Sequence, residues 1–204
     1  ADRSHPQKQF RPIASGKVSL NLAWVMFFII SMGSFILGGL VSKTAVLLLL
    51  LYLLINIAYS VRLKHVVILD VFLISTGFML RILAGSLALD IPPSHWLLFC
   101  GLMLTLFLGF AKRRSEILML ESVGNSTSAS TRKVLDEYSP VLLELYISVS
   151  AACTILSYGS YTVSDKTISL HGTANLIYTL PFVIYGIFRY LYLLHHQSKG
   201  TDTA

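Results

Sequence analysis

Charged side chains that could bind a phosphorylated substrate are gathered in three short segments of the chain. The first segment is ADRSHPQKQFRPIASG, at residues 1–16. The carboxylate of Asp2 is a suitable ligand for Mg²⁺, and the cations of Lys8 and Arg11 suit phosphate. A solvated arm that contacts anionic lipid headgroups would carry the same charges, so charge alone leaves both interpretations open.

The second segment, at residues 59–85, reads YSVRLKHVVILDVFLISTGFMLRILAG and places Asp70 eleven positions before Arg81. At 100° per residue, the two side chains lie within about 20° of each other around a helix axis. An arginine inside an apolar span usually faces a bundle interior or a cavity. We therefore expect Arg81 to face a charged cavity that a ligand uses, with a structural pairing to an acid on a neighbouring helix as the alternative. Three further polar residues lie where this helix begins: Tyr59, Arg62 and Lys64.

The third segment, FLGFAKRRSEILMLES at residues 107–122, places Glu116 four positions after Lys112 and three after Arg113. These are the spacings at which side chains meet on one face of a helix. The pattern predicts that Glu116 pairs with Lys112 or Arg113 on one helix face. Basic residues at this point are equally expected where a membrane span simply ends, so the segment by itself leaves both interpretations open.

Other catalytic and metal-binding patterns are absent from the sequence. It contains no P-loop, no G-x-S-x-G elbow, no H-E-x-x-H pair and no dinucleotide-binding fingerprint. Cys100 and Cys153 lie in apolar runs without the spacing of metal ligands, which is typical of small core residues.

The elements that must position the three segments are predicted to be membrane-spanning helices. Of the 204 residues, 54% are hydrophobic and 13% are charged, whereas soluble domains carry about a quarter charged residues. Apolar runs of ~20 residues match the ~30 Å hydrocarbon layer, and in lipid such runs must be helical. We expect an all-α, polytopic transmembrane bundle that forms one domain over residues 1–204. The predicted spans are 18–40, 44–60, 66–89, 95–111, 141–161 and 175–194.

The distribution of basic residues predicts the orientation of these spans. If the first segment is cytoplasmic, the cytoplasmic loops are about 1–17, 61–65 and 112–140, and basic residues concentrate on that side as the positive-inside rule requires. The site would then face the cytoplasm from a plasma (inner) membrane. The cytoplasmic set of twelve is Arg3, Lys8, Arg11, Lys17, Arg62, Lys64, Lys112, Arg113, Arg114, Arg132, Lys133 and Lys199, against Lys43 and Lys166 outside.

The net charge of +6 does not predict nucleic-acid binding. The basic residues lie in short loops between spans, as membrane topology requires, and form no continuous basic face or tail. The expected partner is therefore the lipid bilayer.

Taken together, the opening motif, the segment around Asp70 and the KRRSE motif resemble the UbiA-type membrane prenyltransferase superfamily over essentially the whole chain. More narrowly, they resemble the bacterial decaprenyl-phosphate phosphoribosyltransferases. The resemblance implies a bundle of about nine transmembrane helices around a central cavity whose polar mouth is capped by cytoplasmic loops. It also implies about two further spans before residue 1 and one after residue 204, so we expect this piece alone to be inactive.

The resemblance also implies roles for individual residues. The first motif of the superfamily is an N-D-x-x-D-x-x-x-D run that binds Mg²⁺–diphosphate, and its last acid corresponds to Asp2. Asp2, as metal ligand, and Asp70 are the implied catalytic residues. The implied substrate-binding residues are Arg3, His5, Lys8, Arg11, Tyr59, Arg62, Lys64, Arg81, Lys112, Arg113 and Glu116.

One departure from the superfamily pattern bears on the substrate. Members that ionise prenyl diphosphates usually carry a second D-x-x-x-D motif, but here Asp70 is followed four positions later by Ile74. The missing acid favours transfer of a phosphoribosyl group from phosphoribosyl diphosphate to polyprenyl phosphate. The alternative enzyme would prenylate an aromatic acceptor. A non-enzymatic lipid-binding or transport subunit would explain the topology and Arg81, but not the opening motif.

Overall fold

The computed structural model describes residues 12–123 and 138–196, without the side chains of residues 119–123. This part of the chain folds into helices joined by short connections and contains no strand, as the composition predicted. The helices are α1 Leu20–Val41, α2 Lys43–Val61, η3 Leu63–His65, α3 Leu69–Ala88, α4 His95–Val123, α5 Pro140–Thr162, α6 Asp165–His171, η6 Asn175–Thr179 and α7 Leu180–His196.

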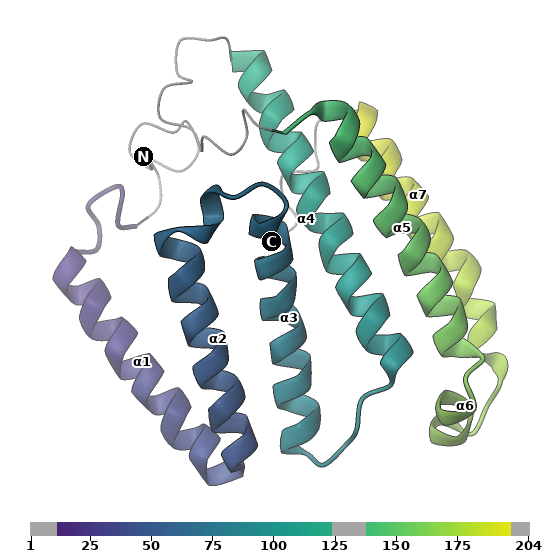
Figure 1. Cartoon of the computed structure of the whole chain (residues 1–204), viewed down its shortest axis with the longest axis horizontal. Helices are drawn as coiled ribbons and strands as arrows, with labels where there is room; N and C mark the ends of the chain where they lie inside the picture. The colour runs from purple at the N-terminus through teal and green to yellow at the C-terminus, as the bar shows by residue number, and fades with distance from the viewer. Residues whose placement is uncertain (1–11, 124–137, 197–204) are drawn as a thin grey trace.

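The long helices stand side by side in chain order from α1 to α4, and α5 and α7 continue the row beyond α4 (Figure 1). Within the described residues, six helices are long and apolar enough to cross a membrane. They correspond one to one with the six predicted spans, so the chain is a multi-span membrane protein.

Two helix boundaries differ from the prediction in ways that matter for the site. Helix α4 continues to Val123, well past the predicted span end at residue 111, because no glycine or proline interrupts the KRRSEILMLESV run. Helix α3 begins later than predicted, because Ile68 adopts a left-handed backbone with φ 67° and the regular helix starts only at Leu69. Lys112, Arg113 and Glu116 therefore lie on a helix.

The core of the described bundle lies between α3, α4, α5 and α7. Phe107, Leu143 and Leu194 are almost fully buried there, and Val71 of α3 packs against α4. Gly109 makes the contact between α3 and α4 possible, since a Cβ at this position would lie 2.5 Å from Cγ1 of Val71. Helix α1, by contrast, has no buried residue and contacts α2. The tightly packed part of the bundle is therefore the part around α3 and α4, which carry the candidate site.

Basic residues are unequally divided between the two ends of the bundle. One end holds the start of α1, the link between α2 and α3, and the ends of α4 and α7; the opposite end holds the turn before α2, the link between α3 and α4, and α6 (Figure 1). At the first end lie Lys17, Arg62 and Lys64, and also Lys112, Arg113 and Arg114 in the second half of α4; at the other end lie Lys43 and Lys166. Arg81 and Arg189 lie within α3 and α7. The helices therefore separate the basic residues of the two ends in the predicted pattern.

Candidate functional site

A buried polar cluster occupies the basic end of the bundle, between α3 and α4. The Asp70 side chain is fully buried, and its Oδ2 accepts a hydrogen bond from Nε of Arg113 at 2.8 Å. Nη1 of Arg113 donates to Glu116, one turn further along α4. The Tyr138 hydroxyl donates to the other oxygen of Asp70, Oδ1, also at 2.8 Å. Two carboxylates thus hold a single guanidinium, and one of them, Asp70, is held in turn by the phenol.

The start of α3 is built to hold this cluster. The backbone N–H of Ile68 donates to the Tyr138 hydroxyl at 2.7 Å, and this residue has the positive φ noted above. A β-branched side chain is unfavourable in the left-handed region and persists there only when its surroundings enforce it. Asp70 lies in the first turn of α3, where a negative charge is favoured by the helix dipole.

The protonation state of Tyr138 follows from its surroundings. Burial, reinforced by the hydrogen bond to Asp70, raises the pKa of the Tyr138 hydroxyl well above its usual value. The hydroxyl therefore keeps its proton at neutral pH. It can then donate to the carboxylate while it accepts from the backbone of Ile68.

A cavity of about 120 Å³ lies between α2 and α3. Its polar feature is Arg81, whose Nη2 donates to the Tyr52 hydroxyl. The Arg81 guanidinium also lies 5.0 Å from the ring centroid of Tyr52 and 5.2 Å from that of Phe78. The cavity is lined by Tyr52, Ile55, Asn56, Tyr59, Leu73, Ile74, Gly77, Phe78 and Arg81.

The structure places Asp70 and Arg81 in different environments, although they share a helix. Asp70 is buried against α4, whereas Arg81 lies about 16 Å further along the axis, at a rise of ~1.5 Å per residue, and contacts a tyrosine of α2. The partner of Arg81 among the described residues is thus a tyrosine on a neighbouring helix and not an acid. Arg81 thus lines a cavity, and the use of this cavity by a ligand stays a prediction.

Tyr59, a predicted site residue near the end of α2, lines the cavity. Arg62 is exposed, and Lys64 and Lys112 are half-buried. Among contacts between described residues, no hydrogen bond or ion pair joins these three cations to the cluster.

Five predicted site residues lie outside the described part of the chain. They are Asp2, Arg3, His5, Lys8 and Arg11. Within the described residues, no group of three or more His, Cys, Asp or Glu side chains is placed to hold a metal ion. Both oxygens of Asp70 are already engaged. The described part therefore does not fit a magnesium site, and the predicted metal depends on Asp2.

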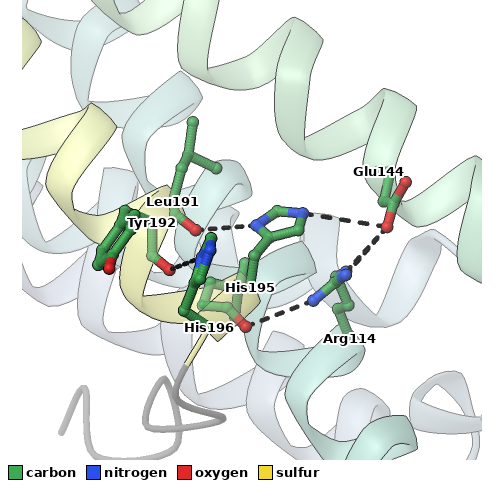
Figure 2. Close-up of polar contacts among 7 residues, drawn as sticks. Arg114, Glu144, Leu191, Tyr192, His195 and His196 are labelled. Atoms are coloured by element: carbon green, nitrogen blue, oxygen red, sulfur yellow. Dashed lines mark hydrogen bonds and ion pairs between the residues drawn. The ribbon is translucent and has the colours of Figure 1, made fainter.

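The second of the adjacent arginines makes a different set of contacts. Figure 2 shows that Arg114 turns away toward α5 and α7, where its Nη2 donates to Glu144 at 2.9 Å and its Nη1 to the backbone oxygen of Leu194 at 3.5 Å. His195 approaches the same Glu144 oxygen at 4.0 Å. Arg113 thus belongs to the cluster, and Arg114 ties three helices together.

Sequence analysis did not identify Tyr138 or Glu144. The only local signal for Tyr138 was its place in the DEYSP run, because Pro140 marks the start of a helix. That signal places Tyr138 just before the start of a helix, but it does not predict the hydrogen bond to Asp70. Glu144 is the only charged residue of its span, and no spacing in the sequence relates it to Arg114.

Comparison with known proteins relates the whole chain to one family. The model of the UbiA prenyltransferase family matches residues 1–204. Curated relatives from three genera bear the name decaprenyl-phosphate phosphoribosyltransferase. The protein of Mycolicibacterium smegmatis is 33% identical over 80% of this chain and 50% of its own length. That of Mycobacterium tuberculosis is 32% identical over 93% and 61%, and that of Corynebacterium glutamicum 34% identical over 100% and 59%. The chain thus spans about half to three-fifths of these relatives.

Proposed function

The chain belongs to the UbiA prenyltransferase family, and from this premise we propose that it forms part of an integral membrane phosphoribosyltransferase. The enzyme would move a 5-phosphoribosyl group from phosphoribosyl diphosphate to a polyprenyl phosphate. The names of the three relatives support this substrate pair. The observation that carries the proposal within this chain is the buried Asp70–Arg113–Glu116 cluster beside a cavity, at the end of the bundle where basic residues gather.

The proposed reaction is a displacement at the anomeric carbon of ribose. A phosphate oxygen of the lipid attacks this carbon, the bond to the diphosphate oxygen breaks with inversion, and the diphosphate leaves with the electron pair. Cations that are already in place stabilise the negative charge as it develops on the leaving group. We assign this role to Lys8 and Arg11, and binding of the sugar or lipid phosphate to Arg62, Lys64 and Lys112.

Arg113 receives a different role in this proposal. Its Nε and Nη1 donate to Asp70 and Glu116, and its side chain is buried, so its charge is already matched by two carboxylates. We propose that Arg113 organises the basic end around it. Asp70, whose two oxygens are also occupied, holds Arg113 in place and is then a positioning residue.

The cavity between α2 and α3 supports binding of the lipid substrate. Its walls include apolar side chains such as Ile55 and Leu73, which suit an isoprenoid chain. We propose that the polyprenyl phosphate enters from the bilayer at this cavity. On the positive-inside rule, the basic end would face the cytoplasm from the plasma membrane.

Membership of the family supports the use of a divalent metal, and we propose Mg²⁺ with Asp2 as its ligand from this chain. Bound there, the ion would supply positive charge to the diphosphate. No step is assigned to it within the described residues, because they do not fit a metal site.

A transfer assay with membranes that contain the full-length protein tests the proposal. Label from radioactive phosphoribosyl diphosphate should enter the lipid fraction only when polyprenyl phosphate is supplied, and either EDTA or Asp2→Asn should abolish the transfer. The same membranes should not prenylate 4-hydroxybenzoate or a naphthoate from a polyprenyl diphosphate. Prenylation without sugar transfer would replace the proposed substrate pair with the aromatic alternative. Lipid binding with neither reaction would favour a non-enzymatic subunit.

A further inference from the structure

A strained turn joins α3 to the link that precedes it, and a tyrosine just before α5 is bonded to that turn. The link, residues 62–67, carries Arg62 and Lys64, to which the proposed function assigns binding of a substrate phosphate. We propose that Tyr138 is a positioning residue, which sets the conformation of the link at Ile68 and thereby the place of these two cations. The proposal deepens the proposed function, and its kinetic test rests on that function.

The turn is a γ-turn centred on Ile68. The N–H of Leu69 donates to the carbonyl oxygen of Val67 at 2.7 Å, and Ile68 between them has φ 67° and ψ −48°. A γ-turn with positive φ is rare and strained, and a β-branched residue makes this conformation still less favourable. The Ile68 side chain is 36% exposed. Burial of this side chain therefore does not explain why isoleucine, and not glycine, occupies the turn.

The hydroxyl of Tyr138 stabilises this turn from outside. It accepts the N–H of Ile68 at 2.7 Å and donates to Oδ1 of Asp70, two residues further on, at 2.8 Å. Ile68 is the N-cap of α3, and its own side chain makes no capping hydrogen bond. One buried hydroxyl therefore ties the strained backbone to the first turn of α3. A phenylalanine ring would fill nearly the same volume and make neither hydrogen bond.

The turn lies close to the cations of the link. The link contains a single 3₁₀ turn, Leu63–His65, which is closed by the hydrogen bond from the N–H of Val66 to the oxygen of Leu63 at 3.2 Å. Lys64 lies within this turn, four residues before Ile68. Because the backbone torsions of Ile68 set the angle at which the link meets α3, a relaxed turn would shift Lys64 relative to α3 and α4.

Helix α5 offers a matched control. Tyr158 lies toward the opposite end of the bundle, where its hydroxyl and Oγ1 of Thr179 are 2.7 Å apart in a hydrogen bond. Tyr158→Phe therefore removes one tyrosine hydrogen bond and leaves the γ-turn untouched. A general loss of helix packing would affect the two tyrosine variants alike.

A substrate-free measurement tests whether the hydroxyl holds the link. Exposed His65 is changed to cysteine and given a nitroxide label, in a full-length protein whose other cysteines are replaced, in lipid nanodiscs. The EPR spectrum should show a more mobile label in Tyr138→Phe and an unchanged one in Tyr158→Phe. A label at Lys43→Cys, at the opposite end, should respond to neither. Should Tyr138→Phe not fold, Tyr138→Phe with Asp70→Asn takes its place, because a buried amide tolerates a missing donor better than a carboxylate does.

Kinetics provide the second measurement. In the transfer assay, Tyr138→Phe should raise the KM of the same phosphate substrate as Lys64→Ala does, with a smaller change in kcat. The expected rise is up to about tenfold, which corresponds to one hydrogen bond. Combining Tyr138→Phe with Lys64→Ala should cause no rise beyond that of Lys64→Ala alone, because the first variant acts through the second residue. Tyr158→Phe should leave both constants unchanged.

Replacement of Ile68 separates the turn from Asp70, the other partner of the hydroxyl. Glycine adopts positive φ without strain, so Ile68→Gly added to Tyr138→Phe should recover part of the lost affinity. An effect that ran through Asp70 and Arg113 would not respond to this change. No recovery, an unchanged label in Tyr138→Phe, or a loss matched by Tyr158→Phe would overturn the positioning role. A more mobile label in a protein that transfers no sugar would leave the control of the link intact and remove the proposed function.

Discussion

At the residue scale, two consecutive arginines have different surroundings. Arg113 is 4% exposed between two acids, whereas Arg114 pairs with Glu144, which is 51% exposed. Successive residues of a helix point about 100° apart, so one turns toward α3 and the other toward α5 and α7. The two positions therefore differ in how much water can compensate for a lost charge.

The pair predicts unequal losses of stability. Arg113→Met leaves Asp70 buried beside a methionine and should lower the free energy of unfolding by about 3–5 kcal/mol, as expected when one partner of a buried ion pair is removed. Arg114→Met should lower it by about 1 kcal/mol or less, since its acid stays hydrated. Unfolding of both variants in mixed micelles measures the difference. Equal losses would show that the Asp70–Arg113 pair is hydrated in solution.

At the element scale, the site depends on the close approach of α3 and α4. The Asp70–Arg113 pair spans these two helices, and Gly109 lies one turn before Arg113 on α4. The missing side chain of Gly109 allows Val71, the neighbour of Asp70, to pack against the α4 backbone. A small residue at one position thus sets the separation across which the ion pair forms.

A methyl group at this contact should disturb both packing and activity. Gly109→Ala places a Cβ 2.5 Å from Val71, and the resulting overpacking should lower the free energy of unfolding by about 1–3 kcal/mol. The matched control is Gly186→Ala on α7, where a Cβ meets no atom within 4 Å. This control should be neutral or more stable by up to about 1 kcal/mol, because alanine favours helices. Thermal unfolding measures the stability of both variants, and the transfer assay measures their activity. A Gly109→Ala protein with unchanged stability and activity would contradict the close α3–α4 contact.

At the scale of the whole molecule, the six helices carry the described polar segments to a common end. Residues near the start of α1, in the link between α2 and α3, and on α4 are far apart in the chain. They lie at the same end of the bundle because successive spans alternate in direction (Figure 1). The basic residues follow the same alternation. The bundle therefore concentrates phosphate-binding charge on one side of the membrane.

Labelling of single cysteines tests this topology. In a protein without Cys100 and Cys153, Lys17→Cys and Lys64→Cys should react with an impermeant maleimide from the cytoplasmic side. Lys43→Cys and Lys166→Cys should react from the opposite side. Right-side-out and inside-out vesicles distinguish the two groups. Reaction of Lys43→Cys and Lys64→Cys from the same side would exclude the six-span arrangement.

The sequence alone predicted that the chain is a membrane protein, that it has six spans, and that its basic residues divide between two ends. The length of an apolar run and the charge of a loop are local properties, so both can be read without knowing the tertiary contacts. Helical spacing also correctly related Arg113 to Glu116. The rule that an arginine in an apolar span faces a cavity agrees with the place of Arg81 in the cavity wall. Periodicity describes direction around one helix axis, but it does not say which neighbour packs there. For this reason only the tertiary structure paired Asp70 with Arg113, 43 positions away, and with Tyr138, 68 positions away. It also showed that Asp70 and Arg81 contact different helices, α4 and α2, although helical spacing relates the two side chains. The physical reason is that the partner of a side chain depends on which helix packs beside that turn.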